Sequence, residues 1–136
     1  MTKRWLLAAA IAFGLAALAW PRIDDVETGR TPEYPDLRPH DYAAGELAAA
    51  KAVKETVSRL PRWSFAGAGA GPTGSEVQAV KTTLVGLAYD VTVRIRRDGS
   101  RTRVSVRSKS RLGPWDFGQN ARNILELQAE LDRAVR

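Results

Sequence analysis

The sequence lacks cysteine altogether, and His40 is the single histidine among its 136 residues. Without cysteine there can be neither a disulfide framework nor a thiolate metal site. One histidine is too few for the metal centres that histidines usually build. We therefore expect no metal ion and no other cofactor.

Phosphate-binding motifs are also missing. Glycine and alanine alternate over residues 67–71, and Pro72 follows them. No Gly-Lys-Ser/Thr follows them, and no GxGxxG pattern leads from a strand into a helix. We interpret this stretch as the flexible turn of a hairpin.

Acidic residues are scarce between Arg94 and Arg111. Overall, 21 Lys and Arg face 15 Asp and Glu, which gives a net charge of +6. Asp98 is the single acid between Arg94 and Arg111. Period-two spacing places five cations on one side of two adjoining strands, away from the valines, and predicts a face for an anionic partner: Arg94, Arg96, Arg103, Arg107 and Lys109. That partner could be a lipid head group or an acidic protein surface, including the chain's own acidic segment, whereas the lack of interleaved aromatics argues against nucleic acid.

One long apolar run is present near the N-terminus, from Trp5 to Trp20, with no charge in it. As a helix it would extend roughly 24 Å, somewhat less than the ~30 Å hydrocarbon core of a bilayer. The two tryptophans suit the membrane interfaces, and Lys3 and Arg4 precede the run. We expect residues 1–22 to form a single transmembrane anchor in a bacterial inner membrane, cytoplasmic or intracytoplasmic. The N-terminus would then be cytoplasmic and the domain periplasmic.

Two further features of the run are relevant. Ala17-Leu18-Ala19 has the form preferred by signal peptidase, so a signal peptide cleaved after Ala19 is the alternative to an anchor. Small residues recur along the helix, and such strips allow close packing of membrane helices. The predicted packing positions are Ala8, Ala10, Ala12, Gly14, Ala16 and Ala19.

Residues 23–44 combine acids with Pro32, Pro35 and Pro39. Proline fixes φ and removes a backbone donor, so we expect an extended, irregular linker.

Residues 45–136 read as one small α+β domain. Apolar residues at helical spacing predict helices over residues 47–60 and near the C-terminus, where Asp116 and Gln119 fit a helix cap. Strands are expected at residues 63–65, 75–84, 88–97 and 101–110. Asp98-Gly99 is a hairpin signal between the last two. The expected fold is an N-terminal transmembrane helix followed by an antiparallel sheet of about four strands, covered by two helices in the order helix, four strands, helix.

A known family carries a similar pattern. Arg107-Ser108-Lys109-Ser110-Arg111 and the residues after it resemble the R-S-x-S-R-x-G-x-x-D-x-G-x-N-x-x-R-I signature of domain of unknown function 1499. The arginine expected before Ile124 stands at Arg122, and Tyr89 stands where an aspartate is often doubled. Residues 31–39 and 90–95 agree as well. The resemblance implies a small α+β domain on a membrane anchor, with no activity to carry over.

No catalytic constellation is visible in the sequence. An unrecognised hydrolase would need a base beside a serine, and His40 lies far along the chain from either serine. The residues available to such a site are Asp90, Asp116, Asn120, Ser108, Ser110 and His40. We therefore expect a non-catalytic, single-pass accessory subunit, bound to other integral membrane proteins of a photosynthetic or respiratory assembly and to membrane lipid. A membrane-anchored periplasmic module for a lipid or small ligand is the alternative, followed by the hydrolase.

Overall fold

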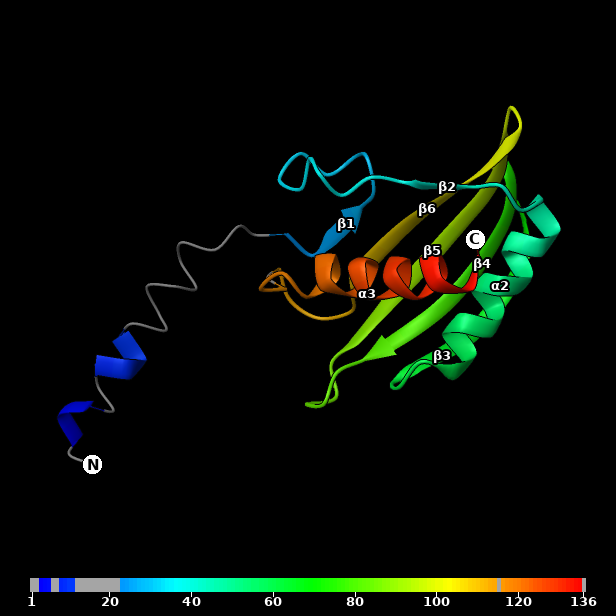
Figure 1. Cartoon of the computed structure of the whole chain (residues 1–136). Helices are drawn as coiled ribbons and strands as arrows, with labels where there is room; N and C mark the ends of the chain where they lie inside the picture. The colour runs from blue at the N-terminus through cyan, green and yellow to red at the C-terminus, as the bar shows by residue number, and fades with distance from the viewer. Residues whose placement is uncertain (1–2, 6–7, 12–22, 115, 136) are drawn as a thin grey trace.

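The structure is a computed structural model, and it describes residues 3–5, 8–11, 23–114 and 116–135. A twisted antiparallel sheet forms one layer and two helices form the other (Figure 1). Two short strands come first, β1 (Asp25–Glu27) and β2 (His40–Tyr42), followed by helix α2 (Glu46–Arg59). The long strands β3 (Trp63–Gly71), β4 (Gly74–Thr82), β5 (Ala88–Asp98) and β6 (Arg101–Ser110) follow, and helix α3 (Gln119–Ala134) ends the fold.

The sheet runs in the order β1, β6, β5, β4, β3, and β2 pairs with β6 beside β1. β1 lies opposite residues 107–109 and β2 opposite residues 102–104, so the two short strands share one edge. The β5–β6 hairpin closes between Asp98 and Arg101, where Gly99 has a φ of 61°. Glycine adopts this left-handed conformation without a steric penalty, which explains the tight turn.

The hydrophobic core lies between the sheet and the helices. Alternate residues of β5 and β6, such as Val93 and Val106, are buried and face α2 and α3. Ile124, Leu127 and Leu131 of α3 lie on one helical stripe and are also fully or almost fully buried. Burying one such side chain contributes about 1.5–3 kcal/mol, so this single layer supplies the main apolar stabilisation.

The sequence prediction of about four strands is wrong, because the sheet has six. The additional strands β1 and β2 lie within the segment expected to be an irregular linker. Buried Leu37 and Thr28 hold this segment, and the Thr28 hydroxyl accepts from the Val106 N–H at 3.0 Å. Both short strands form because the edge of β6 supplies their backbone hydrogen-bond partners. Such pairing between distant segments cannot be predicted from the local sequence.

The glycine-rich stretch differs from its prediction as well. Residues 67–71 belong to β3 and pair with β4, so the hairpin turn is confined to Pro72 and Thr73. Pairing along β4 therefore overrides the flexibility of the glycines.

The predicted transmembrane anchor is also corrected. Among the described residues, no helix is both long enough and apolar enough to span a bilayer. Much of the predicted run lies outside the described residues. The single-pass topology and the inner-membrane localisation with a periplasmic domain, which were based on that anchor, are withdrawn with it.

Candidate functional site

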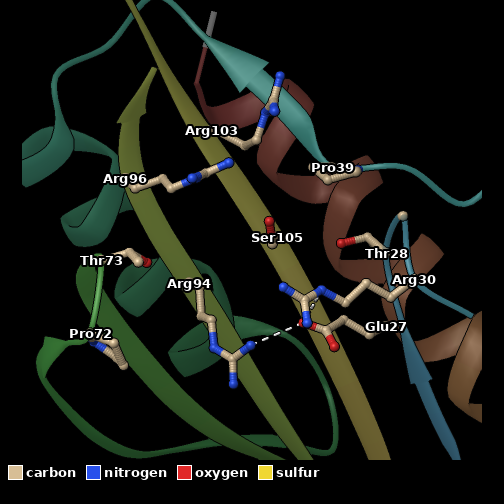
Figure 2. Close-up of a pocket in the computed structure, with 11 residues that line it drawn as sticks. Glu27, Thr28, Arg30, Pro39, Pro72, Thr73, Arg94, Arg96, Arg103 and Ser105 are labelled. Atoms are coloured by element: carbon tan, nitrogen blue, oxygen red, sulfur yellow. Dashed lines mark hydrogen bonds and ion pairs between the residues drawn. The ribbon is translucent and has the colours of Figure 1, made fainter. Parts of the chain in front are cut away.

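A cleft of about 460 Å³ lies on the face of the sheet opposite the helices. Figure 2 shows Arg94 and Arg96 extending from β5, and Arg30 reaching toward them from the loop after β1. The lining includes four arginines, Arg30, Arg94, Arg96 and Arg103, and a single acid, Glu27. We call this hollow the arginine cleft.

The cations in the cleft are unequally compensated. Arg94 donates to Glu27 across 3.0 Å, and Arg30 lies 3.9 Å from the same carboxylate. Arg96 is exposed and makes no hydrogen bond or ion pair with another residue of the described chain. It also stands directly opposite Arg103 in the β5–β6 register. Like charges at directly opposed positions destabilise a sheet, but Arg103 is offset by Asp41 and by Asp98, which lies 3.0 Å from it, so Arg96 is the cation of this pair that lacks an acid.

Two glycines shape the walls of the cleft. A Cβ on Gly74 would lie 2.2 Å from the Ile95 carbonyl oxygen, so only glycine allows the β3–β4 turn to approach β5 this closely. Gly29 has a φ of 72° and donates to the Leu37 carbonyl at 2.7 Å. This bond folds the loop between β1 and β2 back on itself and positions Arg30.

Acids from the N-terminal segment neutralise part of the predicted cationic face. Arg107 pairs with Asp25 of β1 at 2.9 Å, and Arg103 pairs with Asp41 of β2 at the same distance. Because of these hydrogen bonds from arginine, the pKa of Asp25 and that of Asp41 are lowered. Lys109 lies exposed at the far end, opposite Asp25 in the strand register.

The structure thus brings Arg94, Arg96 and Arg103 together in one cleft, while Arg107 lies outside it in an ion pair. Sequence reasoning missed Arg30 and Glu27 because both were assigned to the linker. No local signal marked the strand, since Asp25-Val26-Glu27 is shorter than the roughly four to eight residues over which alternation indicates a strand.

The serines of the candidate hydrolase site lie in a buried amide network instead. Ser108 donates to the Asn120 side-chain oxygen at 2.7 Å, and the Asn120 amide donates to Ser110 at 2.9 Å. The same amide donates to the Asp24 carbonyl, and Asn123 donates to Ser108. These contacts fasten α3 to β6 and to the segment that enters β1.

Asp116 lies at the start of α3 and is buried. Its carboxylate accepts from the backbone N–H groups of Gly118 at 2.8 Å and Asn120 at 3.0 Å. The side chain of Gln119 does not turn back toward Asp116; it contacts Asn123 and Arg122. Asp90 pairs with Arg111 at 2.8 Å on the solvent side.

His40 lies at the other end of α3 from the serines. Its Nδ1 is 2.9 Å from the Asp132 carboxylate, which also accepts from the Tyr42 hydroxyl at 2.7 Å. Burial, reinforced by the bond to Asp132, raises the pKa of Tyr42. In the described structure neither serine hydroxyl is hydrogen-bonded to the histidine, so a serine–base pair is not formed.

Other predicted positions add little to a site. Lys3, Arg4, Trp5, Ala8 and Ala10 are helical and exposed. Ala12, Gly14, Ala16, Ala19 and Trp20 lie outside the described residues. Within the described ranges no three His, Cys, Asp or Glu side chains are grouped so that they could hold a metal ion.

A family model described as "Protein of unknown function (DUF1499)" matches residues 16–131. No curated protein matches the chain.

Proposed function

Because the chain belongs to the DUF1499 family of proteins of unknown function, we propose its function from its own structure: a non-catalytic domain that binds a small anionic ligand in the arginine cleft. The observation that carries this proposal is the convergence of four arginines on a cleft with one acid. The volume of about 460 Å³ falls within the usual range for small-molecule sites.

The uncompensated charge favours an anion as the occupant. The four lining arginines face three acids, Glu27 beside Arg30 and Arg94, and Asp41 and Asp98 beside Arg103, so one positive charge, 4 − 3, remains and Arg96 is the arginine without an acid. The opposed pair of Arg96 and Arg103 would be relieved by a negatively charged group placed between them. Guanidinium groups bind phosphate and carboxylate oxygens through paired N–H donors. A ligand that places a phosphate or carboxylate group at Arg96 therefore fits the cleft best.

The absence of catalysis is part of the proposal. General acid–base or nucleophilic chemistry needs a base within hydrogen-bond reach of the reacting group. Ser108 is hydrogen-bonded to Asn120 near the start of α3, whereas His40 is hydrogen-bonded to Asp132 near its end. This arrangement supports a binding role rather than hydrolysis.

The test is calorimetric titration of the full chain with inorganic pyrophosphate and with citrate at low ionic strength. We expect Arg96→Ala to weaken binding by about tenfold or more, because charge-assisted hydrogen bonds are worth ~1.5–3 kcal/mol. Arg97→Ala is the matched control, since it removes the same charge one residue further along β5 from a side chain that does not line the cleft. Unchanged binding in Arg96→Ala, or equal losses in both variants, would reject the cleft as the site.

A second candidate function, accessory subunit of a larger protein assembly, is favoured by a different observation. Leu84 and Val85 in the β4–β5 loop are 86% and 81% exposed, and Leu112 after β6 is 73% exposed. Both loops lie at the same end of the sheet, because Ala88 at the start of β5 is joined to Arg111 by a backbone bond. An apolar end of this kind fits an apolar protein surface. Pull-down of the C-terminally tagged chain should recover a stoichiometric partner that Leu84→Ser with Val85→Ser loses; recovery of the chain alone would reject this role.

A further inference from the structure

The strand β3 forms one edge of the sheet and has no strand on its outer side in the described structure. The opposite edge differs, because β6 is covered by β1 and β2. An uncovered edge presents a row of unpaired N–H and C=O groups, which is a template for another strand.

The half of β3 from Gly67 to Gly71 also lacks the usual protection of an edge. Natural edge strands carry charged residues, proline or bulges that prevent pairing. Residues 63–71 contain no charged residue and no proline. The single irregularity lies between Phe65 and Gly67, and from Gly67 to Gly71 the register with β4 is continuous. Residues 67–71 of β3 are therefore in regular register with β4, carry no charge and have no strand on their outer side in the described structure.

The hairpin fixes which backbone groups of β3 point outward. Gly71 and Gly74 flank the two-residue turn, and such flanking residues form a hydrogen-bonded pair. Bonded and non-bonded pairs alternate along an antiparallel ladder. Gly69 and Gly67 therefore bond inward to β4, whereas Ala68 and Ala70 direct their N–H and C=O groups away from it.

We propose that β3 pairs with β3 of a second copy of this chain, as an antiparallel two-fold dimer centred on Gly69. In this register each Ala68 faces Ala70 of the other copy, so the outward donors meet outward acceptors at both pairs. The identical strands do not repel each other, because β3 carries no charge. The side chains are hydrogen or methyl, which allows close approach.

The neighbouring helix suits the same symmetry. A groove beside Ala68 and Gly69 is lined from α2 by Ala50, Lys51 and Lys54. A two-fold axis perpendicular to the sheet places the two α2 helices side by side on one face. Lys51 and Glu55 lie 3.9 Å apart and are both exposed, so this side of α2 carries both signs of charge and can meet a second copy of itself.

The test is sedimentation velocity of the full chain over a range of concentrations, with Gly69→Lys as the first variant. The substitution places two lysines directly opposite each other on the two-fold axis, and like charges in that position destabilise a sheet. A Cβ on Gly69 meets nothing within 4 Å, so the monomer accommodates it. We expect the dimer dissociation constant to rise about tenfold in Gly69→Lys and to change far less in the neutral control Gly69→Gln.

A second variant removes the outward donor itself. Ala68→Pro deletes an N–H that β4 does not use, and Ala68→Ser keeps it. Ala68→Pro should lose the dimer while keeping the thermal midpoint of the monomer, and the Ala68 and Ala70 amides should be protected from hydrogen exchange in the wild-type dimer alone. A wild-type chain that is monomeric throughout, or an oligomer that persists in Gly69→Lys and Ala68→Pro, would overturn the proposal. The dimer proposal does not depend on the arginine cleft, since the chain can dimerise through β3 whether or not the cleft binds an anion.

Discussion

At the scale of single residues, Asn120 joins α3 to β6 and to the segment before β1 through three side-chain hydrogen bonds. It is fully buried, and its amide contacts Ser108, Ser110 and the Asp24 carbonyl within 3.1 Å. A truncated side chain would leave several of these groups buried without a partner. We expect Asn120→Ala to lower the free energy of unfolding by roughly 2–3 kcal/mol, measured by urea denaturation. Asn123→Ala removes a longer bond to Ser108, at 3.2 Å, and a bond from the part-buried Gln119 amide, and should cost less. Equal effects of the two variants would contradict the central role of Asn120.

Lys81 supplies a second prediction at this scale. Its side chain is 5% exposed, and its ammonium lies 2.9 Å from Glu126, which also accepts from the Trp63 indole N–H. Glu126→Gln keeps an oxygen for Trp63 but leaves the buried ammonium without its counter-charge. Since Glu126 is 41% exposed and partly screened by water, we expect a loss of about 1–2 kcal/mol rather than the larger cost of a fully buried pair.

Lys81→Met removes the buried charge itself and is the comparison for that variant. Replacing a buried ion by an apolar side chain of similar size is often nearly neutral. Lys81→Met should therefore be more stable than Glu126→Gln in thermal unfolding. The reverse order would show that the ion pair, rather than the uncompensated ammonium, decides stability here.

At the scale of elements, α3 depends on Asp116 for its first turn. The carboxylate satisfies two backbone N–H groups that would otherwise lack partners, those of Gly118 and Asn120. We expect Asp116→Ala to destabilise the protein by about 1–2 kcal/mol in denaturant unfolding, because a capping acceptor is lost in a buried place. Asp116→Asn keeps an acceptor oxygen and should recover part of this loss. An alanine variant as stable as the wild type would show that α3 is held by its apolar face alone.

Elements with a local signal could be predicted from the sequence. Apolar residues at helical spacing predicted the regions of α2 and α3, and Asp98-Gly99 predicted the β5–β6 turn. The strands β1 and β2 could not be predicted in the same way. Each has three residues, lies among prolines and forms because β6 offers it an edge. The glycine-rich half of β3 likewise takes its conformation from β4 rather than from its own propensity.

At the scale of the whole molecule, the composition of the arginine cleft depends on contacts between distant parts of the chain. The cations of β5 and β6 follow from period-two spacing and were visible in the sequence. Arg30 and Glu27 reach the same cleft only because β1 pairs with the edge of β6 and the loop after it returns to the cleft. The sequence therefore predicted that this face is positively charged, but it did not predict which arginines would lack an acidic partner.

The same contacts predict how acid acts on the molecule. Hydrogen bonds from Arg107 and Arg103 lower the pKa of Asp25 and that of Asp41, respectively. For Asp132, burial acts to raise the pKa, but the bonds from Tyr42 and His40 outweigh it and the net shift is downward. A carboxyl whose folded pKa is lowered stabilises the fold above its unfolded value of about 3.9, and loses that contribution as the pH falls through the folded value.

All three carboxylates hold the N-terminal segment, since Asp25 lies in β1, Asp41 in β2, and Asp132 on α3 against His40 and Tyr42 of β2. We therefore expect acidification below about pH 4 to release β1 and β2 before the four long strands unfold. Hydrogen-exchange protection, corrected for the intrinsic pH dependence, should fall first at residues 25–27 and 40–42, and later along β4 and β5. Asp25→Asn should show the β1 change already at neutral pH, because its amide cannot pair with Arg107 as an anion does. Simultaneous loss of protection along the whole sheet would show that the N-terminal strands and the long strands unfold as one unit.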